Sequence, residues 1–240
     1  MRRTLSSIVC VAAVGMGGAA NAQDAASDTT RTRSGPSISF NAGVSSDYVF
    51  RGVSQTKGDP AISIGIDATQ GRFYAGASAT NVGFAGDKNT DAEIDLYAGV
   101  RPEFRGFTLD LGVVNYLYAD QPDGADYNYV ELKAAASRAV GPATLGAAVY
   151  WSPDFFGSTE DQATYAEVNG AVSPADKWTV SAALGRQWLS SDLDYTTWNL
   201  GVGYALTPYL TLDVRYSDTD QHDFGSSYGA RAVASLKATF

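Results

Sequence analysis

The chain has 240 residues, with 26 Asp and Glu against 17 Lys and Arg, one Cys and one His. A hydrophobic content of 45% in a chain of this length excludes a disordered protein and suits one sizeable domain. The acidic balance argues against a nucleic-acid partner, which would require a basic surface. A lone cysteine and a lone histidine exclude a disulfide scaffold and thiolate-rich or histidine-rich metal centres, so we expect no metal and no cofactor.

Residues 1–22 have the features of a secretory signal peptide. Met1-Arg2-Arg3 is basic, the stretch from Leu5 to Ala20 is uncharged, and Ala20-Asn21-Ala22 matches a small-x-small cleavage site. The uncharged stretch is shorter than the roughly 18 residues of a spanning helix, which argues against a membrane anchor. We therefore predict an exported protein, cleaved between Ala22 and Gln23, with a flexible periplasmic linker over residues 23–36.

From Ser37 to Phe240, apolar and polar residues alternate with the period of a β-strand that has two different faces. Twelve segments carry this pattern, and each predicts one strand. In chain order they are residues 38–44, 62–68, 73–79, 92–100, 107–113, 130–136, 143–151, 164–168, 178–184, 198–204, 210–216 and 228–240.

The connections between these segments alternate in length. Short turns are expected at residues 70–71, 101–106, 139–142, 173–177 and 207–209, and longer polar loops at 52–59, 83–90, 119–126, 152–162, 189–194 and 217–227. Short turns on one rim, long loops on the other and an even strand number are typical of an outer-membrane barrel. The predicted fold is all-β: an antiparallel up-and-down transmembrane β-barrel over residues 37–240, with short periplasmic turns and longer acidic extracellular loops.

A soluble β-sandwich or a lipocalin-like barrel would also alternate, but its exposed face would carry many charges. Here the apolar face carries no charge over its central positions. That absence favours a bilayer, where Arg or Lys at the midplane costs about 2–4 kcal/mol. The aromatic residues expected in two interfacial girdles are Tyr48, Phe50, Phe107, Trp151, Trp178, Trp198 and Tyr216.

Three regions carry a resemblance to a known family: SDYVFRGVSQT at residues 46–56, AEIDLYAG at 92–99, and YVELK at 129–133 with YWSPDFFG at 150–157. In these regions the chain resembles the TorF-like porin family, and the resemblance extends over roughly residues 37–240. It implies a Gram-negative outer-membrane barrel and names no solute. The terminal Phe240 is similar to the aromatic C-terminal assembly signal of such proteins. The implied partners are the barrel-assembly machinery during insertion, outer-membrane lipid and lipopolysaccharide.

The polar face of the predicted strands, which would point into the barrel, carries eight acids and seven bases, a nearly balanced set. Mutual pairing within a narrow lumen and a charged constriction that selects solutes are both consistent with it. A barrel of twelve strands leaves the pore radius undecided. The residues expected to line the lumen are Asp47, Arg51, Asp67, Arg72, Glu93, Asp95, Arg101, Asp110, Glu131, Lys133, Glu167, Asp213, Arg215, Arg231 and Lys237.

The long loops hold 13 acids and only two lysines. A ring of acids at the outer mouth would concentrate cations within about a Debye length. We therefore predict a porin-like channel for ions or small solutes with a weak cation preference, although the acids could equally form a divalent-bridged surface among lipopolysaccharide. The residues expected at the mouth are Asp120, Asp123, Asp126, Asp154, Glu160, Asp161, Asp192, Asp194, Asp218, Asp220 and Asp223.

Two functions other than a channel are compatible with such a barrel. A non-conducting structural or adhesive barrel is the main alternative. A barrel-embedded hydrolase is disfavoured because the single histidine, His222, lies in a predicted loop beside Ser226 and Ser227, without a G-x-S-x-G motif. Lumen carboxylates such as Glu93 and Asp95 leave an acid pair open, but we predict that the protein is not an enzyme. Residues 217–223 lack the glycine and distal glutamate of a calcium-binding EF-hand loop.

Overall fold

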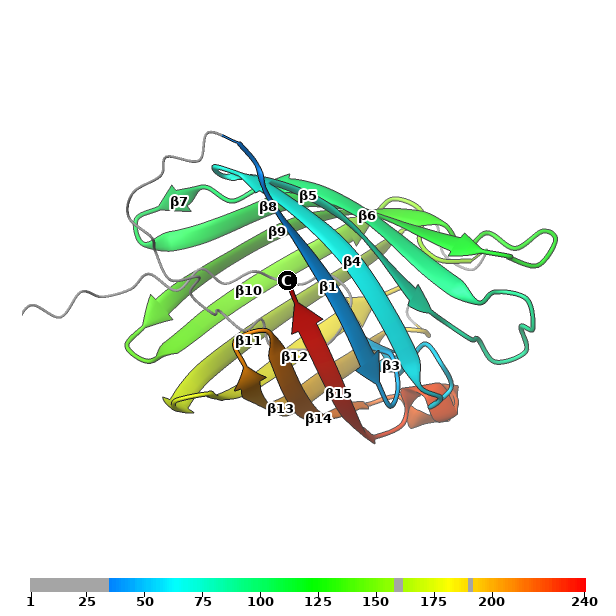
Figure 1. Ribbon diagram of the computed structural model, residues 1–240. Coiled ribbons are helices and arrows are strands. Elements are labelled where there is room, and N and C mark those ends of the chain that lie inside the picture. The colour runs from blue at the N-terminus through cyan, green and yellow to red at the C-terminus, as the bar shows by residue number, and fades with distance from the viewer. Residues whose placement is uncertain (1–34, 158–161, 190–191) are drawn as a thin grey trace, which may run out of the picture.

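Twelve long antiparallel strands form a closed barrel in the computed structural model, which describes residues 35–157, 162–189 and 192–240 (Figure 1). Consecutive barrel strands pair with each other, and β1 also pairs with β15, which closes the sheet. The predicted all-β barrel and its twelve strands are confirmed. The barrel strands are β1 (Ser37–Ser45), β4 (Ala61–Gln70), β5 (Phe73–Asn81), β6 (Ala92–Val100), β8 (Phe107–Ala119), β9 (Tyr129–Val140), β10 (Ala143–Ser152), β11 (Ala163–Ala175), β12 (Trp178–Trp188), β13 (Tyr195–Thr207), β14 (Leu210–Thr219) and β15 (Arg231–Thr239).

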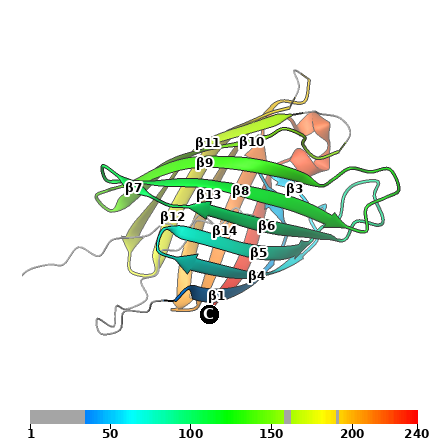
Figure 2. The ribbon, with the colours of Figure 1, turned by 90° about the horizontal axis from the view of Figure 1, so that it is seen from above.

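The two rims of the barrel differ. Short turns join strands at one rim, where the turn between β6 and β8 carries the two-residue strand β7 (Glu103–Phe104). Figure 2 shows this turn at one end of the barrel and the long connections after β5 and β8 at the other. The last long connection contains two short 3-10 helices, η1 (His222–Phe224) and η2 (Ser226–Tyr228). The final strand therefore begins at Arg231, so the prediction that it begins at Tyr228 was wrong.

Among the described residues, no helix is long and apolar enough to cross a membrane. The predicted signal peptide, residues 1–22, and the predicted linker up to residue 34 lie outside the described part of the chain. The mouth acids Glu160 and Asp161 lie outside it as well.

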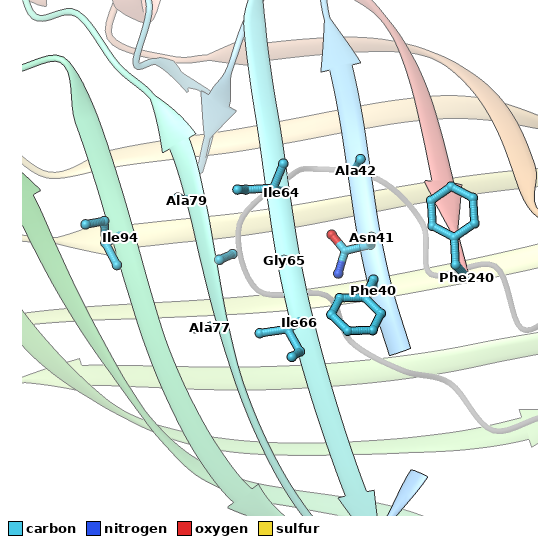
Figure 3. A pocket seen from close by; sticks show the side chains of 11 residues that line it. Phe40, Asn41, Ala42, Ile64, Gly65, Ile66, Ala77, Ala79, Ile94 and Phe240 are labelled. Atoms are coloured by element: carbon cyan, nitrogen blue, oxygen red, sulfur yellow. The ribbon is translucent and has the colours of Figure 1, made fainter. Parts of the chain in front are cut away.

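The outer face of the barrel is apolar and exposed. Ile62 and Leu200 expose 63% and 55% of their surface, although both would be core residues in a soluble protein. A soluble barrel buries this face, whereas a membrane barrel presents it to lipid. Figure 3 shows a shallow groove in this face, where Ala77 and Ala79 of β5 lie low between the isoleucines of β4 and β6.

Charge on this face should destabilise the barrel according to its depth. Leu200 lies near the middle of β13, and Leu206 lies near the short-turn rim on the same strand and face. We expect Leu200→Arg to lower the free energy of unfolding by about 2–4 kcal/mol and Leu206→Arg by about 0–1 kcal/mol. Urea titration of the barrel folded in vesicles measures both. Equal losses at the two positions would contradict a membrane-spanning β13.

On the inner face, large side chains lie against glycines of the neighbouring strand. Tyr97 is paired across the strands with Gly76, and Tyr74 with Gly99. A Cβ atom at Gly76 would lie 2.5 Å from the ring of Tyr97, so only glycine permits this approach. The tyrosine rings therefore lie flat against the wall instead of projecting across the lumen.

Candidate functional site: the barrel lumen

The first long connection folds into the mouth of the barrel instead of projecting outward. Its strands β2 (Val49–Phe50) and β3 (Val53–Ser54) pair as a small hairpin with a two-residue turn. The turn residues Arg51 and Gly52 have φ angles of +48° and +84°, as a type I′ turn requires. A Cβ atom at Gly52 would collide with the Thr197 side chain of β13. The segment predicted as a polar loop at residues 52–59 therefore begins inside the barrel, with β3 of the hairpin.

Arg51, at the tip of the hairpin, binds side chains on the inner face of the barrel. Its guanidinium donates to both carboxylate oxygens of Glu131 on β9, at 2.8 and 2.7 Å, and to Oε1 of Gln187 on β12 at 3.1 Å. It also lies 4.4 Å from the ring centroid of Tyr165 and 4.9 Å from that of Tyr150. Bidentate pairing and cation–π contact are both strong for a desolvated arginine. A non-glycine residue with positive φ is costly, and at this position the ion pair offsets the strain.

The base of the hairpin is held by Asp47 and Tyr48. Asp47 Oδ1 accepts hydrogen bonds from Ser54 Oγ at 2.6 Å and Thr56 Oγ1 at 2.8 Å, and Oδ2 pairs with Arg231 of β15 at 2.7 Å. The hydroxyl of Tyr48 donates to Glu93 Oε1 of β6 at 2.6 Å. The hairpin is thus connected to strands all around the barrel.

Side chains at the level of the hairpin fill the lumen. Eleven of the twelve barrel strands contribute a buried inward residue there, and β15 contributes the partly exposed Arg231. The buried residues include Ser45, Ala61, Thr80, Glu93, Tyr116, Glu131, Ser152, Tyr165, Gln187, Thr197 and Thr219. Nearer the short-turn rim, inward residues such as Asn169 and Asn199 are reached by solvent. The outer part of the lumen is therefore closed in this conformation, and the inner part is accessible.

Four of the predicted lumen acids form ion pairs within the barrel. Asp47 pairs with Arg231, Glu131 with Arg51, Asp110 with both Arg101 and Lys133, and Asp213 with Arg215. The other four, among the described residues, form no ion pair and accept hydrogen bonds from hydroxyl or amide groups: Asp67, Glu93, Asp95 and Glu167. Lys237 lies within electrostatic reach of Asp67. Ion pairing thus involves only half of the predicted lumen acids, and part of the wall remains acidic.

Three expectations about individual side chains were wrong. Arg72 lies in the exposed turn between β4 and β5, with its guanidinium over the outward ring of Phe73, and does not line the lumen. The prediction extended the inward and outward alternation of the strand into the turn, where the alternation no longer holds. Tyr48 and Phe50 were expected in an interfacial girdle, but they lie inside the barrel because the hairpin carries them there. Arg51 does lie in the lumen, as expected, and it reaches this position from the hairpin tip rather than from a barrel strand.

The predicted acidic mouth is partly neutralised. Asp194 accepts hydrogen bonds from the backbone N–H of Leu189 and from Arg186. Asp218 is buried and meets Nε2 of His222 at 2.7 Å. In the loop after β5, hydrogen bonds from the Thr90 hydroxyl and the Asn89 N–H hold the pKa of Asp87 below its usual value, so this acid stays charged. The predicted mouth acids exposed in the described chain are Asp120, Asp123, Asp126, Asp154, Asp192, Asp220 and Asp223.

An aromatic cluster that the sequence did not indicate joins the long loops to the lumen wall. Phe156 stacks on Tyr127 at 4.5 Å and lies edge-on to Phe84 and Tyr118. Tyr116 stacks on Tyr129 at 4.4 Å. The adjacent Phe155-Phe156 pair in a polar loop was the one available signal, because exposed aromatic pairs are rare without a packing partner.

The single histidine does not form a hydrolytic triad among the described residues. Its Nε2 meets Asp218, while Ser226 and Ser227 offer backbone carbonyls to Arg231. No group of three His, Cys, Asp or Glu side chains arranged to hold a metal ion occurs in residues 35–157, 162–189 and 192–240.

A family model places this chain among known sequences. The model of Gcw_chp, described as a bacterial protein of unknown function, matches residues 29–240. The chain belongs to the Gcw_chp family. No curated protein sequence matches it. The match covers the whole barrel, and it does not carry the TorF-like label that the sequence resemblance suggested.

Solved structures share the fold of this Gcw_chp barrel at low sequence identity. The KdgM porin aligns with a TM-score of 0.59 at 10% identity, over 85% of this chain and 98% of that chain. The NanC porin aligns with a TM-score of 0.56 at 9% identity, over 85% and 99%. The COG4313 outer membrane channel from Pseudomonas putida F1 aligns with a TM-score of 0.51 at 14% identity, over 88% of this chain and 97% of that chain. The Gcw_chp chain therefore has a porin-like barrel fold.

Proposed function

We propose that this Gcw_chp protein is an outer-membrane channel for passive passage of ions or small solutes, with a weak preference for cations. The observation that carries the proposal is a closed barrel with an apolar outer face and a charged, partly solvent-accessible lumen. The porin-like fold supports an outer-membrane location, and the basic and apolar residues 1–22 support export through a cleaved signal peptide. The TorF-like resemblance agrees with this location.

Cation preference rests on charge. Four lumen carboxylates form no ion pair in the described chain, and seven predicted mouth acids are exposed at the long-loop rim. A solved structure holds the KdgM porin in complex with disordered oligogalacturonate, which is a polyanion. An acidic wall repels such a solute, so we expect this channel to pass cations and neutral solutes instead.

A non-conducting structural barrel is the second candidate, and one observation favours it. The β2–β3 hairpin and the side chains around it fill the outer part of the lumen. Conduction therefore requires the hairpin to shift or to leave a path beside it.

Single-channel recording in a planar bilayer separates the two candidates. We expect discrete conductance steps and a reversal potential directed toward cation passage under a salt gradient. Changing Asp120, Asp123 and Asp126 to asparagine should move the reversal potential toward zero, because this loop then loses three exposed charges. The control changes Glu103 to glutamine and Asp176 to asparagine at the other rim, away from the predicted acidic mouth. A folded barrel that inserts and never conducts would support the structural alternative.

A further inference from the structure

Two lumen carboxylates lie side by side without a basic partner. Glu93 and Asp95 are two residues apart on β6, so both point into the barrel, and each exposes 3% of its surface. Two other lumen bases are engaged elsewhere, because Arg51 is bound to Glu131 and Lys133 to Asp110. The pair therefore has no ion-pair partner within the described chain.

The two carboxylates differ in how well their oxygens are satisfied. Glu93 accepts hydrogen bonds from Tyr48 at 2.6 Å and from Tyr118 at 2.5 Å, one to each oxygen. Asp95 Oδ2 accepts one from Ser78 Oγ at 3.0 Å, while Asp95 Oδ1 is buried with no hydrogen-bond partner. A buried, unpartnered carboxylate oxygen is costly and unusual in a folded protein. A positive charge beside this oxygen would supply the partner that it lacks.

We infer that Asp95, with Glu93 beside it, binds a monovalent cation inside the lumen. The inference rests on the proposed channel function and names the class of solute that the lumen accepts. Ca²⁺ sites such as the EF-hand gather three or more acidic side chains, and the described chain offers no group of three acidic or other metal-binding side chains here. K⁺ and a primary ammonium group share the chemistry that the site recognises. Each carries a single positive charge and binds carboxylate and hydroxyl oxygens.

The site lies against the hairpin. Tyr48, which bonds Glu93, belongs to the segment that leads into β2, and Ser78 and Tyr116 are the cross-strand neighbours of Asp95. A cation held here would be in contact with the closed part of the lumen, so that movement of the hairpin would expose it. Asp95 would then act as a specificity-determining residue of the channel.

Thermal unfolding of the purified, folded barrel tests the site without requiring conduction. At constant ionic strength, KCl or methylammonium chloride replaces N-methylglucamine chloride, whose cation is too bulky to enter. We expect the small cations to raise the unfolding midpoint by several degrees in a saturable way, because a ligand that binds only the folded state stabilises it. Comparing the midpoint shift in KCl with that in methylammonium chloride decides whether the metal ion or the ammonium group is preferred.

Asp95→Asn is expected to weaken the apparent cation affinity by at least about tenfold, since it removes one of the two charges. The matched control is Glu167→Gln, which removes a lumen carboxylate whose two oxygens both accept hydrogen bonds. It should keep the wild-type response. If Asp95→Asn does not fold, Glu93→Gln, which removes the other carboxylate charge of the pair, takes its place and is expected to weaken the response in the same way.

A wild-type midpoint that is indifferent to both small cations and shifts only with pH would overturn the inference, because the two carboxylates would then hold a proton. Loss of the response in Glu167→Gln as well would also overturn it. A silent barrel that still responds to cations through Asp95 would reject the channel and retain the site, so the two failures are distinguishable.

Discussion

Replacing residues 48–56 with Gly-Ser-Gly is expected to raise the single-channel conductance several-fold. Ser45 at the end of β1 already pairs with Ala61 at the start of β4, so a short linker closes the gap without altering the barrel. The shortened chain no longer carries Tyr48, Phe50 or Arg51, and the ring of buried side chains that they cover becomes accessible to water. Single-channel current at fixed salt, and vesicle swelling with sugars of increasing size, measure the change.

The control for this deletion shortens an exposed loop. Replacing residues 122–125 with Asp-Gly shortens an exposed turn at the same rim and keeps its one acid. It should leave the conductance as in the wild type. If the hairpin deletion folds, inserts and conducts no better than the wild type, then the hairpin does not close the lumen.

Breaking the ion pair between Arg51 and Glu131 should release the hairpin. Arg51→Met leaves Glu131, which exposes 1% of its surface, without its charged partner. Removing one member of a buried pair costs about 3–5 kcal/mol. Because 1.4 kcal/mol is about tenfold, the equilibrium between docked and undocked hairpin should shift by more than about 100-fold. The open probability in single-channel recordings reports this shift.

The double variant Arg51→Met with Glu131→Leu should recover much of the closed state, since a matched apolar pair replaces a buried ion pair at little cost. Arg186→Met is the matched control. Arg186 pairs with Asp194 at 3.5 Å with 42% of its side chain exposed, and such a pair contributes about 0–1 kcal/mol. Equal effects of Arg51→Met and Arg186→Met would show that the buried pair does not hold the hairpin.

The barrel was predictable from the sequence because lipid imposes a strict rule on every strand. Outward residues at the central positions of a strand must be apolar, so the alternation in β4 or β13 reveals both the strand and its faces. Turn length then distinguishes the two rims. The twelve strands followed from these local patterns alone, without any information on which strand closes against β1.

The lumen was less predictable because its contacts join distant segments. Arg51 and Glu131 are 80 residues apart, and no local pattern shows that a polar segment turns inward. Tyr48 and Phe50 keep the even-numbered apolar parity of β1, so the segment resembled a strand end followed by a loop. Arg72 was misplaced because the alternation of the strand was extended into a turn, in which the backbone direction reverses.

The hairpin docks against strands that come late in the chain. Arg51 contacts β9 to β12, Gly52 lies against β13 and β14, and Asp47 is bound to Arg231 of β15. β15 is the strand that closes the ring against β1. These partners surround the hairpin only after the ring has closed, so its docking belongs to the end of folding. A docked Arg51 therefore marks a barrel whose assembly is complete.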